Sequence, residues 1–577
     1  MKKHYFFIKF LLNLQYISLG LFLIFSTSPA LAYTPPLGIP DPGMWGTTHP
    51  IDGVAPSTVT KCPSWPNAQA TGCYYIDNTH PQATNTSNTL GYPNKPRLTL
   101  PATSFLAGSY VEMHGGPYTT NLNLHMNGTA DNPVWFKGTA VNMPTFTNYI
   151  YFTNSTYLFV EYLDFNGGTN TCIKITGSAS NNVVIRNSKF RNRGWVSNCS
   201  AVGVTPDQGG INHDIIFYNN EFSELGTWDT IVDEDFHAIN PTTYGRTPPT
   251  ELYNVWCLNN SFYHLSGNGV QVNAHNETMI PYLHHVYIGK NTGSACRQAI
   301  LWSKQANHII MSQNVAYDNR EHGSQPGNGI GYQYNPDNLW IIFNEIYNSS
   351  SGIRQSDSGT VTTNHNVYIL GNKIYNIHPL PGEKYNPDDP FPTGYAISFW
   401  KGKQNRYVLN NTIYDVNGAF LISQDGNAVF EDNIASDIHS DNHHVYNINA
   451  QAAGMVSLTN NIFFSNTTFS AKWGSLYTTL ESFYAAKGTG ANCIFANPEF
   501  TNTSTYDLTL QSTSPAIGRG SRHSAYGIFE AQYGINIDVD FNGTPRPAGA
   551  WTIGAFEPSI LKNNLPAPPA PQATINK

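Results

Sequence analysis

Three side chains that can move a proton or hold an anion fall on short strand-like segments in the middle of the chain: Lys304, Tyr334 and Arg354. An arginine can neutralise the carboxylate of a uronic acid and so stabilise the carbanion-like transition state that develops beside it. A lysine with a lowered pKa can remove the adjacent proton, and a tyrosine can protonate the leaving oxygen or replace the lysine as base. We assign Arg354, Lys304 and Tyr334 to these roles, as the candidate catalytic residues of a β-elimination.

Polar and aromatic residues that suit sugar binding accompany these three on the same segments. The candidate substrate-binding residues are Gln271, Asn273, Gln333, Asp357, Trp400 and Lys401. Alignment of the segments places Gln271 with Arg354 at one strand position, and at a later position it stacks Lys304, Tyr334, Asp357 and Lys401. Such a stack is unusual in a chain with 12% charged residues. The alternative is a ladder of opposite charges that contributes modest stability.

An acidic segment lies before the first of these strands. Its candidate metal ligands are Asp233, Glu234 and Asp235, with Asp229 and His237 nearby. Clustered carboxylates suit calcium, which is the one cofactor that the sequence suggests. The same carboxylates can instead form the acid and base of a glycoside hydrolase, which are separated by roughly 5 to 10 Å. An acidic surface loop without a ligand is the third interpretation.

A repeat determines the elements that must position these residues. One asparagine follows each of a series of apolar runs, at intervals between 22 and 40 residues: Asn220, Asn260, Asn291, Asn314, Asn344, Asn372, Asn411, Asn433 and Asn461. An asparagine side chain offers donors and an acceptor and tolerates unusual backbone angles, so stacked asparagines can satisfy the amides of a buried turn. The unequal intervals indicate a solenoid whose loops differ in length.

A second strand follows the asparagine in each coil. These strands cover residues 269–273, 299–304, 329–334, 352–357 and 396–401, and each begins with a small residue followed by an apolar one. Alternate residues of a strand face the core or the solvent. This alignment directs Trp302 and Tyr332 toward the core.

The sequence therefore predicts an all-β fold, a single-stranded right-handed parallel β-helix with a small C-terminal cap that is β-rich and helical. The helical spacing of Leu476, Leu480, Phe483 and Tyr484 predicts a helix over the last coil. The expected parts are a signal peptide (1–32), an N-terminal extension and cap (33–94), the β-helix (95–470), the C-terminal cap region (471–557) and a flexible tail (558–577).

The start of the chain indicates export. Basic residues, an apolar run over 10–25 and the sequence Ala30-Leu31-Ala32 follow the order of a secretory signal peptide. The run is short for a membrane span and no second one follows, so we expect no integral membrane segment after cleavage. We expect a secreted protein, extracellular or periplasmic, that is a monomer. The net charge of -8 argues against nucleic acid as a partner.

Seven cysteines are compatible with disulfides in an exported protein. Cys62 and Cys73 bracket a proline-containing loop and form the first candidate pair. Cys172 and Cys199 are expected on adjacent coils and form the second. With an odd number of cysteines, at least one thiol stays unpaired within the chain.

The asparagine column, the coils of unequal length and the β-rich terminal piece together resemble the pectate-lyase-like right-handed parallel β-helix superfamily of secreted bacterial proteins. The resemblance covers most of the mature chain and implies a polysaccharide as partner. It does not select a reaction, because that superfamily contains lyases, hydrolases, epimerases and non-catalytic surface proteins. No polygalacturonase-type Asn-Thr-Asp motif with a partner Gly-His-Gly occurs, and no complete motif of a single lyase family is found.

The expected function is β-elimination of a uronic-acid-containing polymer. The resemblance implies the same residue types, because related lyases use Lys, Arg or Tyr and often calcium. A glycoside hydrolase that uses the acidic segment is the first alternative. A non-catalytic carbohydrate-binding or structural surface protein is the second.

Overall fold

The computed structural model describes residues 33–195, 199–232, 234–274, 276–323, 325–356, 365–385, 393–400, 402, 404–423, 426–439, 444–449, 455–465 and 468–558. The expected signal peptide, the tail from residue 559, and the candidate residues Asp233, Asp357 and Lys401 lie outside the described residues. The expected domain boundaries stay predictions.

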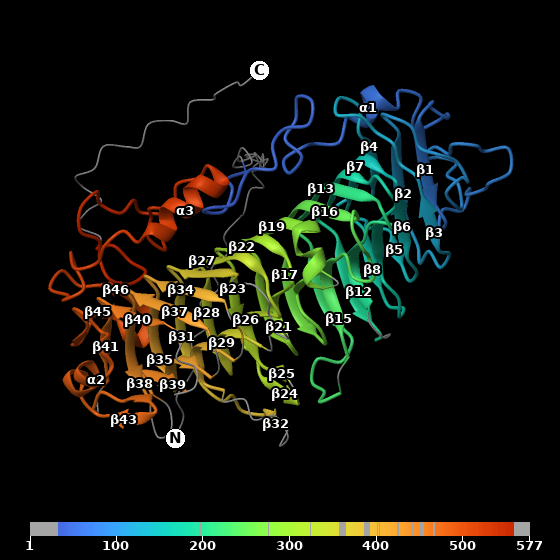
Figure 1. Ribbon diagram of the computed structural model, residues 1–577. Helices are drawn as coiled ribbons and strands as arrows, with labels where there is room; N and C mark the ends of the chain where they lie inside the picture. Colours follow the sequence, from blue (N-terminus) through green and yellow to red (C-terminus); the bar gives the residue numbers. More distant parts are fainter. Residues whose placement is uncertain are drawn as a thin grey trace, which may run out of the picture. The chain divides into compact units, whose positions relative to one another are not determined.

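Three long sheets build most of the described chain, and the backbone visits them in turn (Figure 1). In one such coil, β16 (Glu251–Leu258) belongs to sheet 1, β17 (Ser261–Leu265) to sheet 2 and β18 (Val270–Asn273) to sheet 3. The next strand, β19 (Leu283–Gly289), returns to pair with β16 in parallel. Parallel pairing between successive coils is the mark of a parallel β-helix, so the predicted mostly-β, parallel architecture is confirmed.

Sheet 1 contains 14 strands. Besides β16 and β19, they are β1 (Cys73–Asp77), β2 (Tyr110–His114), β4 (Val134–Lys137), β7 (Thr156–Glu161), β10 (Asn181–Arg186), β13 (Ile211–Tyr218), β22 (Asn307–Ser312), β27 (Asp337–Ile342), β30 (Asn366–Leu370), β34 (Asn405–Leu409), β37 (Asn427–Glu431) and β40 (Val456–Thr459).

Sheet 2 contains 13 strands. Besides β17, they are β5 (Thr145–Phe146), β8 (Asp164–Asn166), β11 (Lys189–Arg193), β14 (Glu221–Leu225), β20 (Thr292–Cys296), β23 (Val315–Tyr317), β28 (Glu345–Ser349), β31 (Lys373–Ile377), β35 (Thr412–Val416), β38 (Ile434–Ile438), β41 (Ile462–Phe464) and β44 (Ile494–Phe495).

Sheet 3 contains 14 strands and carries most of the candidate residues. Besides β18, they are β3 (Leu122–Leu124), β6 (Ile150–Thr153), β9 (Ile173–Thr176), β12 (Cys199–Val204), β15 (Phe236–Pro241), β21 (Ala299–Lys304), β26 (Asn328–Gln333), β29 (Ser351–Gln355), β33 (Tyr395–Phe399), β36 (Gly418–Ile422), β39 (Tyr446–Ile448), β42 (Ala471–Trp473) and β43 (Ser475–Tyr477). Its last pair, β42 and β43, is antiparallel.

Few other elements occur in the described chain. The helices are α1 (Thr58–Lys61), η1 (Glu277–Tyr282), α2 (Leu480–Lys487), η3 (Thr503–Thr505) and α3 (Ser524–Tyr533). Two small sheets are formed by β24 (Glu321–Gly323), β25 (Gln325–Pro326) and β32 (Lys384–Tyr385), and by β45 (Phe500–Asn502) and β46 (Asp507–Leu510). None of the helices in the described ranges combines the length and apolar character that crossing a membrane requires.

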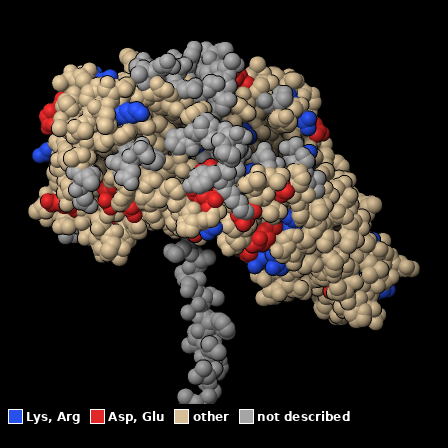
Figure 2. Space-filling view, turned by 90° about the horizontal axis from the view of Figure 1, so that it is seen from below, with Lys and Arg blue, Asp and Glu red and all other residues tan. Residues whose placement is uncertain are grey.

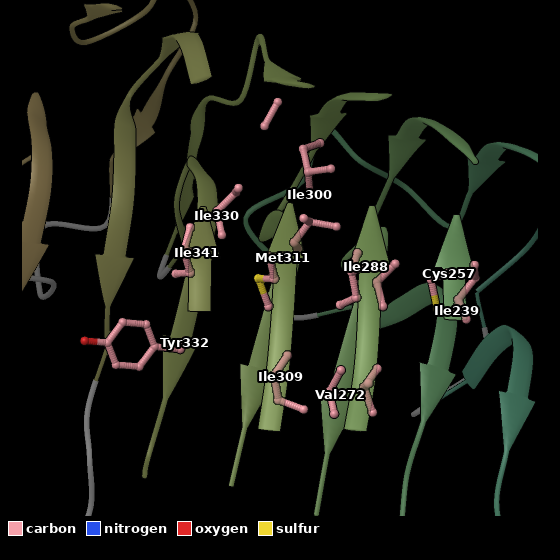
Figure 3. Packing of buried hydrophobic residues seen from close by; sticks show 14 of the residues in the cluster. Ile239, Cys257, Val272, Ile288, Ile300, Ile309, Met311, Ile330, Tyr332 and Ile341 are labelled. Carbon is pink, nitrogen blue, oxygen red and sulfur yellow. The ribbon is translucent and has the colours of Figure 1, made fainter. Parts of the chain in front are cut away.

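The inner faces of the three sheets enclose one long apolar core (Figure 3). Each coil adds its own layer of branched aliphatic side chains, such as Ile288, Ile309 and Ile330. The phenylalanines of sheet 2 stack from coil to coil, with ring centroids 4.7 Å apart between Phe190 and Phe222. Leu480 and Phe483 of α2 join this core, so a helix follows the last coil as predicted. It begins later than expected, because Leu476 belongs to β43 and is exposed.

The asparagine column is confirmed at every predicted position. The backbone N–H and Nδ2 of Asn314 both donate to Oδ1 of Asn344, at 3.0 and 2.9 Å, and Asn344 repeats this toward Asn372. Each Nδ2 also donates to a backbone carbonyl, that of Met311 in the case of Asn344. The column ends at Asn461, which donates to Sγ of Cys493. These bonds satisfy the buried turn between sheets 1 and 2 in each coil.

One of the two expected disulfides is present. Cys62 and Cys73 are joined, as predicted. Cys172 and Cys199 are buried and no disulfide joins them, which corrects the second expected pair. The register explains the difference: Cys172 donates its backbone N–H to Ala201, so Cys199 lies two residues away from the position beside Cys172 on the neighbouring coil.

The side chain of Asp432 binds the C-terminal segment to the coils, and its ionisation affects stability. Its Oδ2 accepts the backbone N–H of Ser521 at 2.8 Å. Burial, with repulsion from Glu431, raises the pKa of Asp432 to about 7. An unfolded aspartate titrates near 4, so between about pH 4 and pH 7 only the unfolded state loses its proton. Asp432 therefore costs stability as the pH rises through this window.

We expect Asp432→Asn to raise the free energy of unfolding at pH 8 by about 1–3 kcal/mol and to change it little at pH 4. Asparagine keeps the acceptor for Ser521, and it tolerates the left-handed backbone at this position, where φ is 57°. Thermal unfolding of both proteins at the two pH values measures the difference. An equal effect at pH 4 and pH 8 would show that ionisation of Asp432 is not the cause.

Candidate functional site

The outward side chains of sheet 3 form two columns that run along the coils. Column A contains Lys174, Gly203, Asn240, Gln271, Trp302, Gly331, Arg354 and Ser398. Column B lies two residues further along each strand and contains Thr242, Asn273, Lys304 and Gln333. Their spacing follows from the strand separation of about 4.8 Å between coils.

The register confirms part of the predicted alignment and corrects the rest. Gln271 and Arg354 share column A, as predicted. Lys304 pairs with Gln333, so Tyr334 lies one position later and does not stack on Lys304. Tyr334 follows the end of β26 with a left-handed backbone, φ 61°.

The same one-residue shift moves one of the two aromatic residues that were expected in the core. Tyr332 is fully buried in the core, as predicted (Figure 3). Trp302 belongs instead to the outward column A, opposite Gly331. A side chain at Gly331 would collide with the Trp302 ring, so this glycine provides the room that the indole occupies.

A hollow of about 450 Å³ opens over the strands β9, β12, β15, β18 and β21. It is lined by Lys174, Ser200, Gly203, Thr205, Asp235, His237, Asn240, Thr242, Tyr244, Arg246, Gln271, Asn273 and Lys304. Four of the predicted site residues are therefore brought together: Gln271, Asn273, Lys304 and Asp235. Gly203 lies in the floor, and a Cβ there would meet only the Ser200 hydroxyl, at 3.2 Å.

Three cationic side chains converge on this hollow, namely Lys174, Arg246 and Lys304. Charged residues make up 12% of the chain, and most of the described residues on the face shown in Figure 2 are neither acidic nor basic. Burial, reinforced by the nearby Arg246 charge, lowers the pKa of Lys174, while Asp207 opposes this. Arg246 is anchored by a bond of 2.7 Å from Nε to the Pro206 carbonyl. This arrangement favours an anionic ligand.

His237 is a neutral hydrogen-bond donor in the wall of the hollow. Burial, with the charges of Lys304 and Arg297, lowers the pKa of His237 to about 3. Its Nδ1 accepts the backbone N–H of Asn268 at 3.0 Å, so the proton of the neutral ring is on Nε2. From the sequence, His237 was predicted only as a neighbour of the acidic segment.

The one carboxylate in the lining, that of Asp235, already has a cationic partner. Its Oδ1 accepts from the guanidinium of Arg297 at 3.0 Å and also from the amide of Gln298. The Arg297 side chain is fully buried, which makes this pair part of the wall. Glu234 lies beside it but does not line the hollow, and its backbone carbonyl accepts from Arg297 at 3.2 Å.

Several predicted residues lie outside the hollow. Arg354 is buried in column A, three coils beyond Gln271, which is about 14 Å along the axis. Tyr334, Gln333 and Trp400 also belong to later coils and do not line it. Arg354 and Trp400 can contact only a different part of a long ligand from the part held near Lys304, whereas Gln333 lies beside Lys304 in column B, with Tyr334 next to it.

Lys174, Arg246 and Tyr244 also line the hollow and were not among the residues predicted from the sequence. Lys174 alternates with the core residues Ile173 and Ile175, a pattern that places it on the outer face. Extending the alignment of the second strands by three coils toward the N-terminus would have found it. Arg246 and Tyr244 lie in the turn after β15, where no periodicity constrains a side chain.

No protein-family model matches the sequence, and no curated protein sequence matches it. The three parallel sheets identify the fold on their own. It is a parallel β-helix built from three sheets.

Solved structures of similar fold include a lacto-N-biosidase of family GH136 from Eubacterium ramulus, with 12% identity over 68% of this chain and a TM-score of 0.37. This chain spans 64% of the length of that enzyme. Pectate lyase Pel9A matches with 13% identity over 84% of this chain and 96% of its own, with a TM-score of 0.36. The A-module of the mannuronan C-5 epimerase AlgE6 from Azotobacter vinelandii matches with 11% identity over 65% of this chain and 91% of its own, also at 0.36. Likenesses at this level give no information on activity.

Proposed function

We propose that the protein binds a uronic-acid-containing polysaccharide in the hollow of sheet 3 and cleaves it by β-elimination. The observation that carries this proposal is the convergence of Lys174, Arg246 and Lys304 around a lining whose carboxylate, Asp235, is paired with Arg297. A neutral sugar needs no such cations, whereas a uronate brings one carboxylate per ring.

The lining supplies each group that an elimination requires. Lys174 and Arg246 neutralise the substrate carboxylate, which stabilises the negative charge that develops next to it. Lys304 in its unprotonated form removes the proton beside the carboxylate, and the double bond forms as the bond to the leaving oxygen breaks. The resulting Lys304 ammonium group then gives this proton to the leaving oxygen. His237 donates from Nε2 to a substrate oxygen, and Gln271, Asn240 and Asn273 bind the sugar hydroxyls. Arg354 and Tyr334 bind neighbouring rings of the polymer.

Calcium and the hydrolase alternative both depend on the acidic segment. The Arg297 partner satisfies the charge of Asp235, which favours a structural role for this carboxylate over catalysis as a free acid and base. Calcium on Glu234 and Asp235, together with Asp233, remains a prediction, tested by activity with calcium and with a chelator. We also propose that the β-helix is right-handed and single-stranded and that residues 471–557 cap it. The protein is proposed to be a secreted monomer.

The deciding experiment follows the ultraviolet absorbance of unsaturated uronates while the purified protein acts on a panel of polyuronates, with neutral polysaccharides as negative substrates. We expect absorbance to rise with one class of polyuronate. Lys304→Ala should lower kcat/KM at least about 100-fold, because a general base contributes 10²–10⁴-fold. Lys472→Ala is the matched control, since Lys472 also lies on the outer face of sheet 3, in the register of column A beyond β36 and β39, and is exposed.

New reducing ends without unsaturated product would replace the lyase with a hydrolase. Binding of polyuronate without any cleavage would leave a carbohydrate-binding protein. Equal activity of Lys304→Ala and Lys472→Ala would exclude the hollow as the catalytic site.

A further inference from the structure

A second group of reactive side chains lies at the corner between sheets 2 and 3, well along the chain from the hollow. It consists of His378, Asp415 and His439, whose ligand atoms all lie within 4.8 Å of one another. Within the described residues this is the one cluster of three such groups that can hold a metal ion. The proposed function uses none of them.

The fold brings these residues together through the register of three successive strands. Ile377 of β31, Val416 of β35 and Ile438 of β38 pair side by side. His378, Asn417 and His439 follow these three residues directly, so they form one column across the coils. Asp415 and Asp437 precede them, and both have a left-handed backbone, with φ of 56° and 54°. The left-handed backbone at Asp415 and Asp437 places their carboxylates at the same corner as the two histidines.

The nitrogens and oxygens are arranged as a ligand set. Nε2 of His378 lies 2.8 Å from Oδ1 of Asp415, and Nε2 of His439 lies 2.9 Å from the same oxygen. Two imidazole nitrogens and one carboxylate oxygen therefore converge on one point. A zinc-class ion binds such atoms at about 2.0–2.2 Å, so it fits between them after movements of a few tenths of an ångström.

Neighbouring groups hold the ligands from outside. Nδ1 of His378 lies 2.7 Å from Oδ1 of Asn417, which fixes Nε2 as the nitrogen that faces Asp415. The other oxygen of Asp415 accepts the Tyr506 hydroxyl at 2.9 Å. An oxygen partner on the far ring nitrogen and a hydrogen bond to the ligating carboxylate are the usual outer supports of a metal site. An ion pair on the surface requires neither of these two hydrogen bonds.

The cluster is also open to solvent on one side. The His439 side chain is 51% exposed, and those of His378 and Asp415 are 23% and 20% exposed. An ion can therefore enter from solution, and water can complete its coordination. Asp437, with Oδ2 at 3.7 Å from Nε2 of His439, is positioned to supply a fourth protein ligand.

We propose that His378, Asp415 and His439 bind one divalent transition-metal ion of the zinc class. The ion joins three coils of the β-helix, and through the Tyr506–Asp415 bond it reaches the segment that follows η3. Two imidazoles with one carboxylate suit zinc or cobalt and not calcium, which takes oxygen ligands alone. The site is separate from the predicted calcium ligands, which lie before β15.

The test is titration of the full-length protein, without a histidine tag, with Co²⁺ and then with Zn²⁺. We expect one equivalent of Co²⁺ to give visible absorption bands that Zn²⁺ abolishes, and Zn²⁺ to raise the melting temperature. His378→Ala and His439→Ala should each weaken binding at least about 100-fold. Asn417→Ala should weaken it about 10- to 100-fold, as removal of an outer-shell partner does. Asp415→Asn, which is nearly isosteric, guards against misfolding of the alanine variants.

The control variant is His284→Ala. His284 also lies in a histidine cluster, with Nδ1 2.6 Å from Nδ1 of His285 and Nε2 3.0 Å from Glu251. We expect it to leave the stoichiometry and affinity unchanged. The proposal is overturned if no equivalent binds, or if His284→Ala removes binding while folded Asp415→Asn retains it. Circular dichroism of each variant confirms that the fold is kept.

Discussion

Asn344→Ala is expected to lower the free energy of unfolding by about 3–4 kcal/mol, because it breaks the asparagine column in its middle. Oδ1 of Asn344 accepts from two donors of Asn314, and its Nδ2 donates to the Met311 carbonyl and to Oδ1 of Asn372. Alanine removes all four bonds and leaves the buried donors of Asn314 without this acceptor, while Oδ1 of Asn372 keeps the backbone N–H of residue 344. Each such group carries its own desolvation penalty, so the cost exceeds that of one exposed hydrogen bond.

Denaturant unfolding followed by circular dichroism measures this change, with Asn366→Ala as the matched control. Asn366 begins β30 in the neighbouring coil and accepts from Nδ2 of Asn405 at 3.1 Å, at a half-buried position. Its loss should cost less than about 1 kcal/mol. If the two variants lose equal stability, the buried column is not what holds the coils in place.

Gly203→Phe is expected to abolish binding and cleavage of polyuronate while the fold stays intact. Gly203 lies in column A between Lys174 and Asn240, in the floor of the hollow. Its strand position accepts a larger side chain, since a Cβ meets only the Ser200 hydroxyl and aromatic residues favour strands. The phenyl ring then occupies the space between the cations. We expect kcat/KM to fall at least about 100-fold, because the substrate loses its near-attack position.

Activity on the polyuronate that the wild-type protein cleaves, together with the melting temperature, checks this prediction. A variant that is fully active at an unchanged melting temperature would show that the substrate does not enter this hollow. Gly203→Ala serves as the control, since a methyl group adds little volume and should leave most of the activity.

The fold was predictable because its signal is repeated in every coil. The asparagine column needs both a buried turn and an amide side chain, and nine coils show it independently, from Asn220 to Asn461. The disulfide between Cys62 and Cys73 was predictable from proximity in sequence. The separation of Cys172 from Cys199 was not predictable. The length of the intervening loop determines which residues become neighbours, and periodicity does not reveal that length.

The site was predictable only in part, for a specific physical reason. In β21 the two consecutive apolar residues Ile300 and Leu301 allow two alignments with Val270, and the structure pairs Val270 with Leu301. A shift of one residue exchanges the two faces of a strand, which moves Trp302 outward and Lys304 beside Gln333. Arg246 lies in a turn, so only the three-dimensional structure brings it to Lys174.

The residues just before the column asparagines have a consequence for misfolding. In four coils that residue is itself an asparagine with a left-handed backbone: Asn219, Asn259, Asn410 and Asn460. A chain that slips by one residue in these coils still offers an amide to its neighbours. In the four consecutive coils of Asn291, Asn314, Asn344 and Asn372 the preceding residues are Lys290, Gln313, Phe343 and Gly371. A slip there puts no asparagine in the column, and only Gln313 offers an amide, on a side chain that is one methylene longer. The central coils therefore act as a template with one permitted alignment, and kinetic traps and aggregation-prone species should arise from the coils on either side of it.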